Sequence, residues 1–446
     1  SIFCRLNSAK WAPLYPYILI PFAILIPLAM AIEILTPEKL PGPIFTITEK
    51  SLSILTFLSL INSKILFTSS VLFLIFLLIF LTKKLLLTLK PIESFLPVKL
   101  IIKKSFIIIS FIVFLLPINN YYSHAKNIED YGIISLMYHR FEENKYPSTN
   151  IRIQDFKSQI DLVKNSGIKF ISHKEFEEFV NIDNSDKKIL LTIDDGFSSF
   201  YNRAWPILKK EKIPFIIFIN TENVGSRGYM SWEEIKEIAK FDFVHIGNHS
   251  HSHEYLVDWS DDEIEKDLKT SIKLFKEKLN HETKFFAYPF GEYKKSYKEI
   301  VKKLGFEYAF GQHSGVMDKT KDKFELPRFP INEKYGEEKR FKSILQTIPF
   351  PYLKITPEEK YLNPKNNPPN VSITFFENGP NFKNITCYSN EEDKWRKSKI
   401  KFINNNQLNI ILEGKFTTER GRINCSLREN TGEWRWLGIQ FVVSDL

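Results

Sequence analysis

The most constraining stretch of the sequence is an apolar run that ends in two acidic residues and a glycine. Residues 189–196 read ILLTIDDG. A short apolar run of this kind is typical of a buried β-strand, and a glycine after the acids lets the backbone turn sharply. The sequence therefore predicts that Asp194 and Asp195 lie where a buried strand ends, at the rim of a sheet.

A second stretch, GNHSHSH at residues 247–253, carries histidines at a regular spacing. His249 and His253 are four residues apart, which is one helical turn, so we expect both rings to face the same point. One carboxylate with two imidazoles is a ligand set suited to a divalent metal used in hydrolysis. A second carboxylate beside such a site is then free to act as a base.

The chain from residue 132 to residue 310 alternates between strand and helix patterns. We expect strands at 132–138, 189–193, 214–220, 243–246, 285–288 and 306–310, and helices at 155–165, 201–208, 231–238, 260–279 and 296–304. Ser231 with Glu234, and Ser260 with Glu263, have the spacing of capping boxes at the start of helices. Repeated strand–helix units predict an α/β fold with a parallel sheet, here a distorted (β/α) barrel of about seven strands.

In such a barrel the chemistry collects at the carboxyl ends of the strands. Five residues of interest fall at those ends, namely His139, Asp194, Asp195, His249 and Pro289. The domain that we predict to carry them spans residues 126–340.

The first 125 residues read as a membrane region with two or three hydrophobic spans. Residues 71–81 are uncharged, and with residues 65–70 they approach the ~20 residues that cross a bilayer. Lysines between the second and third spans place everything after residue 118 outside the cytoplasm. Residues 99–125 read equally well as a signal peptide. Both alternatives export the rest of the chain, to the outer face of the cytoplasmic membrane or as a secreted protein.

The C-terminal part has a different character. Residues 341–370 are rich in Pro, Asn and Lys and are predicted to be a linker, and the short β-type runs at 371–446 predict a small all-β sandwich. Cys387 and Cys425 lie in this sandwich, where an exported protein could pair them if the strand geometry permits. The net charge of +9 comes largely from lysines near the membrane, and no basic helix indicates nucleic acid as a partner.

Three motifs together resemble the polysaccharide deacetylase family, also described as NodB-homology or carbohydrate esterase family 4. They are TIDDG at 192–196, GNHSHSH at 247–253 and FFAYPFGEY at 285–293. LMYHR at 136–140 and LPRFPIN at 326–332 resemble most the branch that contains exported poly-N-acetylglucosamine deacetylases. The resemblance covers roughly residues 132–335.

The resemblance implies a role for each residue that matches a motif. Asp195, His249 and His253 would bind the metal, with zinc as the first choice, and Asp194 would be the general base. The backbone N–H of Phe290, after Pro289, would help to hold the oxyanion. The general acid is open between His139, which we favour, and His313. The family's arginine is missing because Ala287 stands there, and Arg328 is expected to replace it.

The function expected from the resemblance is removal of N-acetyl groups from an amino-sugar polysaccharide. Tyr138, Pro289, Tyr293 and His313 are candidates to line the sugar groove, with burial in the core as the alternative for the aromatic residues. Membrane lipid and the machinery of polysaccharide synthesis or export are further expected partners. Two other functions stay open, a carbohydrate-binding or assembly protein that has lost turnover, and a deacylase of O-acetylated or lipid-linked sugars.

Overall fold

The structure is a computed structural model, and it describes residues 131–182, 186–377 and 379–444. All of these lie in one compact unit that spans Ile118–Leu446. The membrane spans predicted within residues 1–125 lie outside the described residues. Of the helices in the described part, none is long and apolar enough to cross a membrane.

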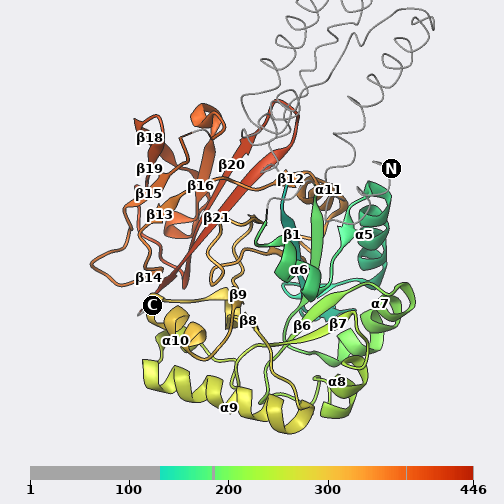
Figure 1. Ribbon diagram of the computed structural model, residues 1–446. Helices are drawn as coiled ribbons and strands as arrows, with labels where there is room; N and C mark the ends of the chain where they lie inside the picture. The colour runs from blue at the N-terminus through green and yellow to red at the C-terminus, as the bar shows by residue number, and fades with distance from the viewer. Residues whose placement is uncertain (1–130, 183–185, 378, 445–446) are drawn as a thin grey trace, which may run out of the picture. The chain divides into compact units, whose positions relative to one another are not determined.

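A curled, largely parallel sheet forms the centre of the first domain of the described chain, which contains β1 to β11 (Figure 1). Its main path runs β10-β1-β5-β6-β7-β8-β9, with β11 beside β1 and β4 beside β5. The strands are β1 (Ile133–Tyr138), β4 (Lys169–Phe170), β5 (Lys188–Ile193), β6 (Phe215–Ile219), β7 (Val244–Asn248), β8 (Phe285–Ala287), β9 (Tyr308–Phe310), β10 (Val316–Met317) and β11 (Phe329–Pro330). The predicted α/β class is confirmed, and the sheet path ends at β9 and β10, so the barrel is open.

Helices connect the parallel strands and cover the sheet. They are α5 (Ile153–Ser166), α6 (His173–Phe179), α7 (Trp205–Glu211), α8 (Trp232–Ile238), α9 (Asp261–Leu279) and α10 (Lys295–Lys303). A separate pair of short strands, β2 (Arg140–Phe141) and β3 (Asn150–Ile151), follows β1. The capping boxes predicted at Ser231 and Ser260 are both present.

Both faces of the sheet are buried, which explains the unbroken apolar run in β5. Ile189, Leu191 and Ile193 belong to the core between the sheet and the helices, whereas Leu190 belongs to the core on the concave face. Successive strand side chains point to opposite faces, so a strand buried on both sides has no polar positions to alternate with.

Two helical segments differ from the prediction. Helix α6 was not predicted, although Ser172 and Glu175 form a capping box at its start. The helix expected at 201–208 is a π turn at Phe200–Ala204 followed by α7. Pro206 explains the change, because its nitrogen has no N–H to continue the α-helical hydrogen bonds.

The C-terminal domain consists of two sheets packed around their own apolar core. One sheet has the order β12-β21-β20-β16-β17 with β14 beside β21, and the other has the order β13-β15-β19-β18. The strands are β15 (Val371–Thr374), β16 (Thr386–Ser389), β17 (Arg396–Lys397), β18 (Lys399–Asn404), β19 (Gln407–Ile411), β20 (Arg420–Arg428) and β21 (Trp434–Val443). Cys387 and Cys425 occupy directly opposed positions of β16 and β20 and form a disulfide.

The segment 341–370, predicted as a linker, contains secondary structure that joins the C-terminal sheets. It holds most of α11 (Glu338–Leu345), then β12 (Thr347–Ile348), β13 (Lys354–Thr356) and β14 (Tyr361–Leu362). β12 and β14 pair with β21, and β13 pairs with β15. These strands have only two or three residues, too few for a hydrophobic period to reveal them.

Candidate active site

The two adjacent aspartates at the end of β5 have different partners. The backbone N–H of Asp194 donates to the carbonyl of Tyr138 at 2.8 Å, which extends the strand pairing by one residue. Asp195 and Gly196 then both have a positive φ, 74° and 75°. Such a turn is strained for a non-glycine residue, and it directs the two carboxylates to separate places. Both side chains are buried, with residue exposures of 0% and 8%.

Asp195 lies against the two predicted histidine ligands. Its Oδ1 atom is 3.3 Å from Nε2 of His249 and 3.0 Å from Nε2 of His253. In the described part of the chain, these three residues are the one group of His, Cys, Asp or Glu side chains arranged to hold a metal ion. The structure therefore brings together the ligand set that the sequence predicted.

The tautomer of His249 shows that this cluster fits a cation. Its Nδ1 atom is 2.7 Å from the carbonyl oxygen of Ala287 in β8. A carbonyl can only accept, so Nδ1 carries the proton and Nε2 of the neutral ring is an acceptor. This Nε2 and Oδ1 of Asp195 are both buried without a hydrogen-bond partner. Two buried acceptors that face each other are unfavourable unless a cation lies between them.

The histidine loop does not form the helical turn that the spacing predicted. Residues 249–255 form an irregular loop, in which Ser250 and His253 have φ values of 67° and 55°. The N–H of His253 donates to Oγ of Ser250 at 3.1 Å. The prediction of a helical turn is wrong, because loop residues with positive φ bring the two rings together instead.

A buried aspartate outside the motifs holds this loop in place. Asp267 on α9 accepts the backbone N–H groups of His251 and Ser252 at 2.8 and 3.0 Å. Its side chain belongs to the buried stripe of α9 that also contains Ile264 and Leu268. Sequence reasoning missed Asp267, although an acid on an apolar helix stripe is a signal for a buried hydrogen-bonding role.

Arg328 orients the other aspartate. Its Nη1 and Nη2 atoms donate to Oδ1 and Oδ2 of Asp194 at 2.7 and 2.8 Å, and its Nε donates to the carbonyl of Gly311 at 2.9 Å. Both side chains are fully buried. Burial by itself raises the pKa of Asp194, but Arg328, with His249 and His139, outweighs burial and leaves the pKa lowered. This carboxylate is therefore held ionised and in a single orientation.

The two candidates for the general acid lie in different surroundings. Nε2 of His139 is 3.9 Å from Oδ2 of Asp194, and its side chain is 12% exposed. Burial lowers the pKa of His139, with the two aspartates acting in the opposite direction. Burial also lowers the pKa of His313, to about 4, and its Nδ1 has no hydrogen-bond partner. No hydrogen bond or ion pair among the described residues joins His313 to either aspartate.

The turn after β8 places Phe290 beside the metal-ligand cluster. Phe290 has a φ of 58° within the short 3-10 turn Pro289–Gly291. Its ring meets the ring of His253 edge to face at a centroid distance of 4.8 Å, and it stacks on Tyr255 at 4.2 Å with an angle of 6°. The backbone that was predicted to help hold the oxyanion is thus next to one of the histidine ligands.

Three of the predicted groove residues are core residues instead. Tyr138 is 1% exposed and its hydroxyl donates to Gln159 at 2.8 Å, while Tyr293 is 3% exposed and packs against Tyr288. Pro289 is buried as well. The prediction that Tyr138 and Tyr293 line a sugar groove is wrong. Tyr138 points to the helix side of the sheet, a consequence of strand alternation, where it packs on Phe156.

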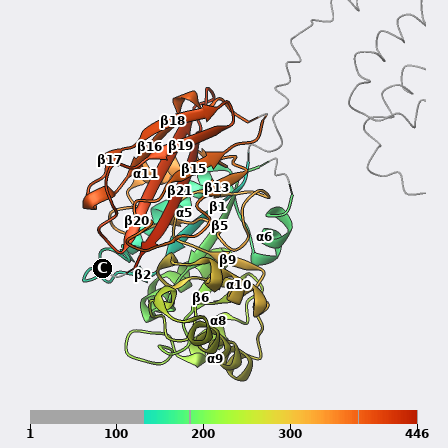
Figure 2. The ribbon, with the colours of Figure 1, turned by 90° about the vertical axis from the view of Figure 1, so that its left-hand side faces the viewer.

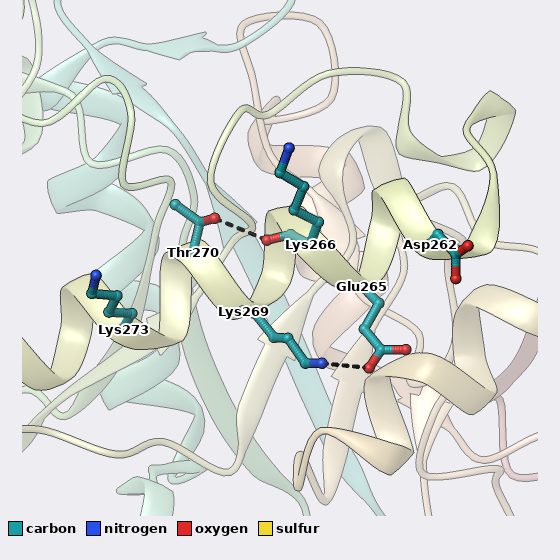
Figure 3. A pocket seen from close by; sticks show the side chains of 6 residues that line it. All are labelled: Asp262, Glu265, Lys266, Lys269, Thr270 and Lys273. Atoms are coloured by element: carbon teal, nitrogen blue, oxygen red, sulfur yellow. Dashed lines mark hydrogen bonds and ion pairs between the residues drawn. The ribbon is translucent and has the colours of Figure 1, made fainter.

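A surface pocket lies along the outside of α9 and is unrelated to this cluster (Figure 3). Side chains of α9 alone line it: Asp262, Glu265, Lys266, Lys269, Thr270 and Lys273. Figure 3 shows these charged side chains spread along one helix, with Lys269 paired to Glu265. None of them contacts the aspartates or histidines of the site, so this pocket is not the substrate site.

The cluster that could hold a cation lies at the carboxyl edge of a curled α/β sheet, beside a carboxylate held by a buried arginine, and this arrangement is suited to hydrolysis. Residues 181–309 match the sequence model of a family described as polysaccharide deacetylase. The part of the chain that carries the aspartates and histidines is thus similar to polysaccharide deacetylases, which are hydrolases. The resemblance predicted from the motifs is thereby confirmed.

Individual proteins are also similar to parts of this chain. YxkH of Bacillus subtilis (strain 168) is 24% identical over 199 residues, which are 44% of this chain and 70% of that protein. A poly-beta-1,6-N-acetyl-D-glucosamine N-deacetylase of Staphylococcus aureus (strain MSSA476) is 29% identical over 192 residues, 40% of this chain and 66% of that protein. The solved structure of IcaB from Ammonifex degensii has 28% identity and a TM-score of 0.43, and the match covers 46% of this chain and 94% of that one.

Proposed function

We propose that this protein removes N-acetyl groups from a polysaccharide of the poly-N-acetylglucosamine type by metal-assisted hydrolysis. The observation that carries the proposal is the buried cluster in which Oδ1 of Asp195 faces Nε2 of His249 at 3.3 Å and Nε2 of His253 at 3.0 Å. Neither Oδ1 of Asp195 nor Nε2 of His249 has a hydrogen-bond partner of normal geometry among the described residues. Asp194 lies next to them with a different set of partners. A sugar-binding protein without turnover has no need for either arrangement.

The metal would be held by Asp195, His249 and His253, and zinc is our first choice because it favours this mixed nitrogen and oxygen ligand set. A divalent ion there supplies Lewis acidity to the amide carbonyl and to the attacking water. His249 is prepared for this role because Ala287 fixes its tautomer. Other divalent ions are compatible with the same ligands.

Asp194 would act as the general base. Arg328 keeps this carboxylate ionised and fixes its plane, so that a remaining lone pair can accept the proton of the attacking water. The N–H of Phe290 would donate to the oxygen of the amide as negative charge develops on it. His139, 3.9 Å from Asp194, would give a proton to the departing amine. His313 is not favoured for this step because it has no contact with the aspartates in the described residues.

The proposal places the catalytic domain outside the cytoplasmic membrane, either anchored by the N-terminal segments or secreted. The disulfide between Cys387 and Cys425 supports this location, since such bonds persist in oxidising compartments. Contact with membrane lipid and with polysaccharide synthesis or export machinery rests on the sequence of the first 125 residues alone.

Acetate release from N-acetylglucosamine oligomers by the purified protein tests the function. We expect release that a chelator stops, that added zinc restores, and that Asp194→Asn reduces by roughly 10²–10⁴-fold in kcat without loss of bound metal. Release that continues in the chelated protein would refute the metal mechanism. A metal-loaded protein that releases no acetate from these oligomers would instead indicate an O-acetylated or lipid-linked substrate.

Arg328→Lys tests the arginine that replaces the family's usual one. A lysine keeps the charge but cannot hold both carboxylate oxygens, so we expect kcat to fall by roughly 10–100-fold with little change in KM. The measurement is steady-state acetate release at saturating metal. Unchanged turnover in this variant would remove Arg328 from the mechanism.

A further inference from the structure

The C-terminal domain is joined to the catalytic domain directly beside the active site. Strand β21 runs along the catalytic domain in both ribbon views (Figures 1 and 2). The N–H of Gly438 donates to the carbonyl of Ser314 at 2.6 Å, and Nε2 of Gln440 donates to the carbonyl of Gly291 at 3.4 Å. A Cβ atom at Gly438 would lie 2.6 Å from the Ser314 nitrogen. The close backbone approach therefore requires glycine and fixes the β-domain next to the Phe290 turn.

Arg420, at the start of β20, reaches this turn. Its Nε donates to Oε1 of Glu292 at 2.5 Å, and its guanidinium carbon lies 5.6 Å from the centre of the Phe290 ring. Phe290 in turn contacts the metal-ligand histidine His253. The Tyr255 ring that stacks on Phe290 is 38% exposed. A cation from one domain and an exposed aromatic face from the other thus meet beside the site.

Arg422 follows two residues later on the same face of β20. Its side chain is half-buried, and its strand partner on β21 is Gln440, the residue that binds the Phe290 turn. Within the described residues, no carboxylate lies within ion-pair distance of Arg422. Arg420 is paired with Glu292, and the carboxylates of Glu419 and Asp258 lie close enough to act on Glu292 as well. The side chain of Arg422 forms no hydrogen bond or ion pair among the described residues, so its donors are open to a ligand.

From this arrangement we infer that the C-terminal β-domain forms one wall of the sugar-binding cleft, and that Arg420 and Arg422 contact the polymer next to the sugar held at the metal site. This inference rests on the proposed function for the identity of the ligand. Guanidinium N–H groups donate to the hydroxyl and acetamide oxygens of an acetylated sugar. The exposed face of Tyr255 packs against the apolar face of a pyranose ring.

The test is binding of N-acetylglucosamine pentamers to the full chain carrying Asp194→Asn, which prevents turnover during the measurement. Isothermal titration calorimetry measures the affinity for the fully acetylated pentamer. We expect Arg422→Gln to weaken binding of this pentamer by about tenfold, the effect of one charged hydrogen bond. Arg422→Lys should lose only part of this affinity.

Arg428→Gln is the matched control, since Arg428 lies on the same face at the exposed far end of β20, against Trp434. We expect it to bind the acetylated pentamer as the parent protein does. Equal binding by the Arg422→Gln and Arg428→Gln proteins, or no binding of pentamer at all, would overturn the inference. Acetate release is measured separately on the protein with native Asp194. If this protein releases no acetate but pentamer binding still depends on Arg422, the proposed function is wrong and the inference about the β-domain stands.

Discussion

Strand β7 has a histidine near each of its ends, and the two rings have opposite environments. His245 lies near the start of the strand, and His249 follows its carboxyl end. His249 faces a carboxylate and donates to a carbonyl. His245 instead stacks on His173 at a centroid distance of 4.2 Å, and its Nε2 pairs with the hydroxyl of Thr283 at 3.0 Å. The comparison shows that the neighbours of a histidine, and not its place on a strand, decide whether it is suited to hold a metal ion.

The pKa values follow the same contrast. Burial lowers the pKa of His245 to about 2 and that of His173 to about 4, and neighbouring histidines add to the effect. For His253 burial also acts downward, but Asp195 outweighs it and the pKa is raised. The cluster at the amino end of β7 thus excludes positive charge, whereas the cluster at the carboxyl end attracts it.

The largest expected effect comes from replacing each of the two histidines of β7 in turn. His249→Gln removes a ligand, so we expect bound metal to fall below stoichiometric amounts and acetate release to fall by roughly 10²–10⁴-fold or more. His245→Gln should retain both metal and activity, and should cost roughly 0.5–3 kcal/mol of unfolding free energy through lost packing. Metal analysis, acetate release and thermal melting are measured on both proteins. Loss of metal in the His245 variant would refute the contrast.

A smaller effect is expected when the hydrogen bonds that hold the histidine loop in place are weakened. Asp267→Asn replaces one of two acceptors with an amide that donates, so one of the N–H groups of His251 and Ser252 loses its partner. We expect metal affinity to fall by about 10–100-fold, with nearly normal kcat once metal is saturating. A competition titration with a metal-binding dye measures the affinity. Ser271→Ala on the same buried stripe, whose hydroxyl has no hydrogen-bond partner, is the control.

The smallest expected effect is a change in the free energy of unfolding with pH, caused by His245 in the histidine cluster at the amino end of β7. Because the pKa of His245 is lower in the folded than in the unfolded chain, protons bind preferentially to the unfolded state. The stability is fully present above about pH 6.5 and decreases as the pH falls below it, by up to about 2 kcal/mol at pH 5. Denaturant melts at pH 7 and pH 5 measure it. The decrease should be smaller in His245→Phe by that amount, and an equal decrease in both proteins would show that His245 does not cause it.

Much of the catalytic domain could be predicted from its sequence. The strands around Ile189 and Phe215 are short apolar runs, and Ser231 and Ser260 begin helices with capping boxes, so local patterns specify these elements. Asp195, His249 and His253 were predicted as a group because a carboxylate and two histidines four residues apart form a typical ligand set, and their motifs follow apolar strands. Tyr138 and Tyr293 were not placed correctly, because an aromatic residue at a strand end has the same sequence pattern whether it faces a groove or the core.

By itself, the sequence indicated which strands end in polar motifs and which residues are candidates for metal ligands and base, because each motif lies within a few neighbouring positions. Only the tertiary structure decided what surrounds them. The contact of Arg328 with Asp194 spans 134 residues, and that of Arg420 with Glu292 spans 128. Asp267 reaches the histidine loop from another helix. Such contacts depend on how separate elements pack, and no periodicity or spacing along the chain records that packing.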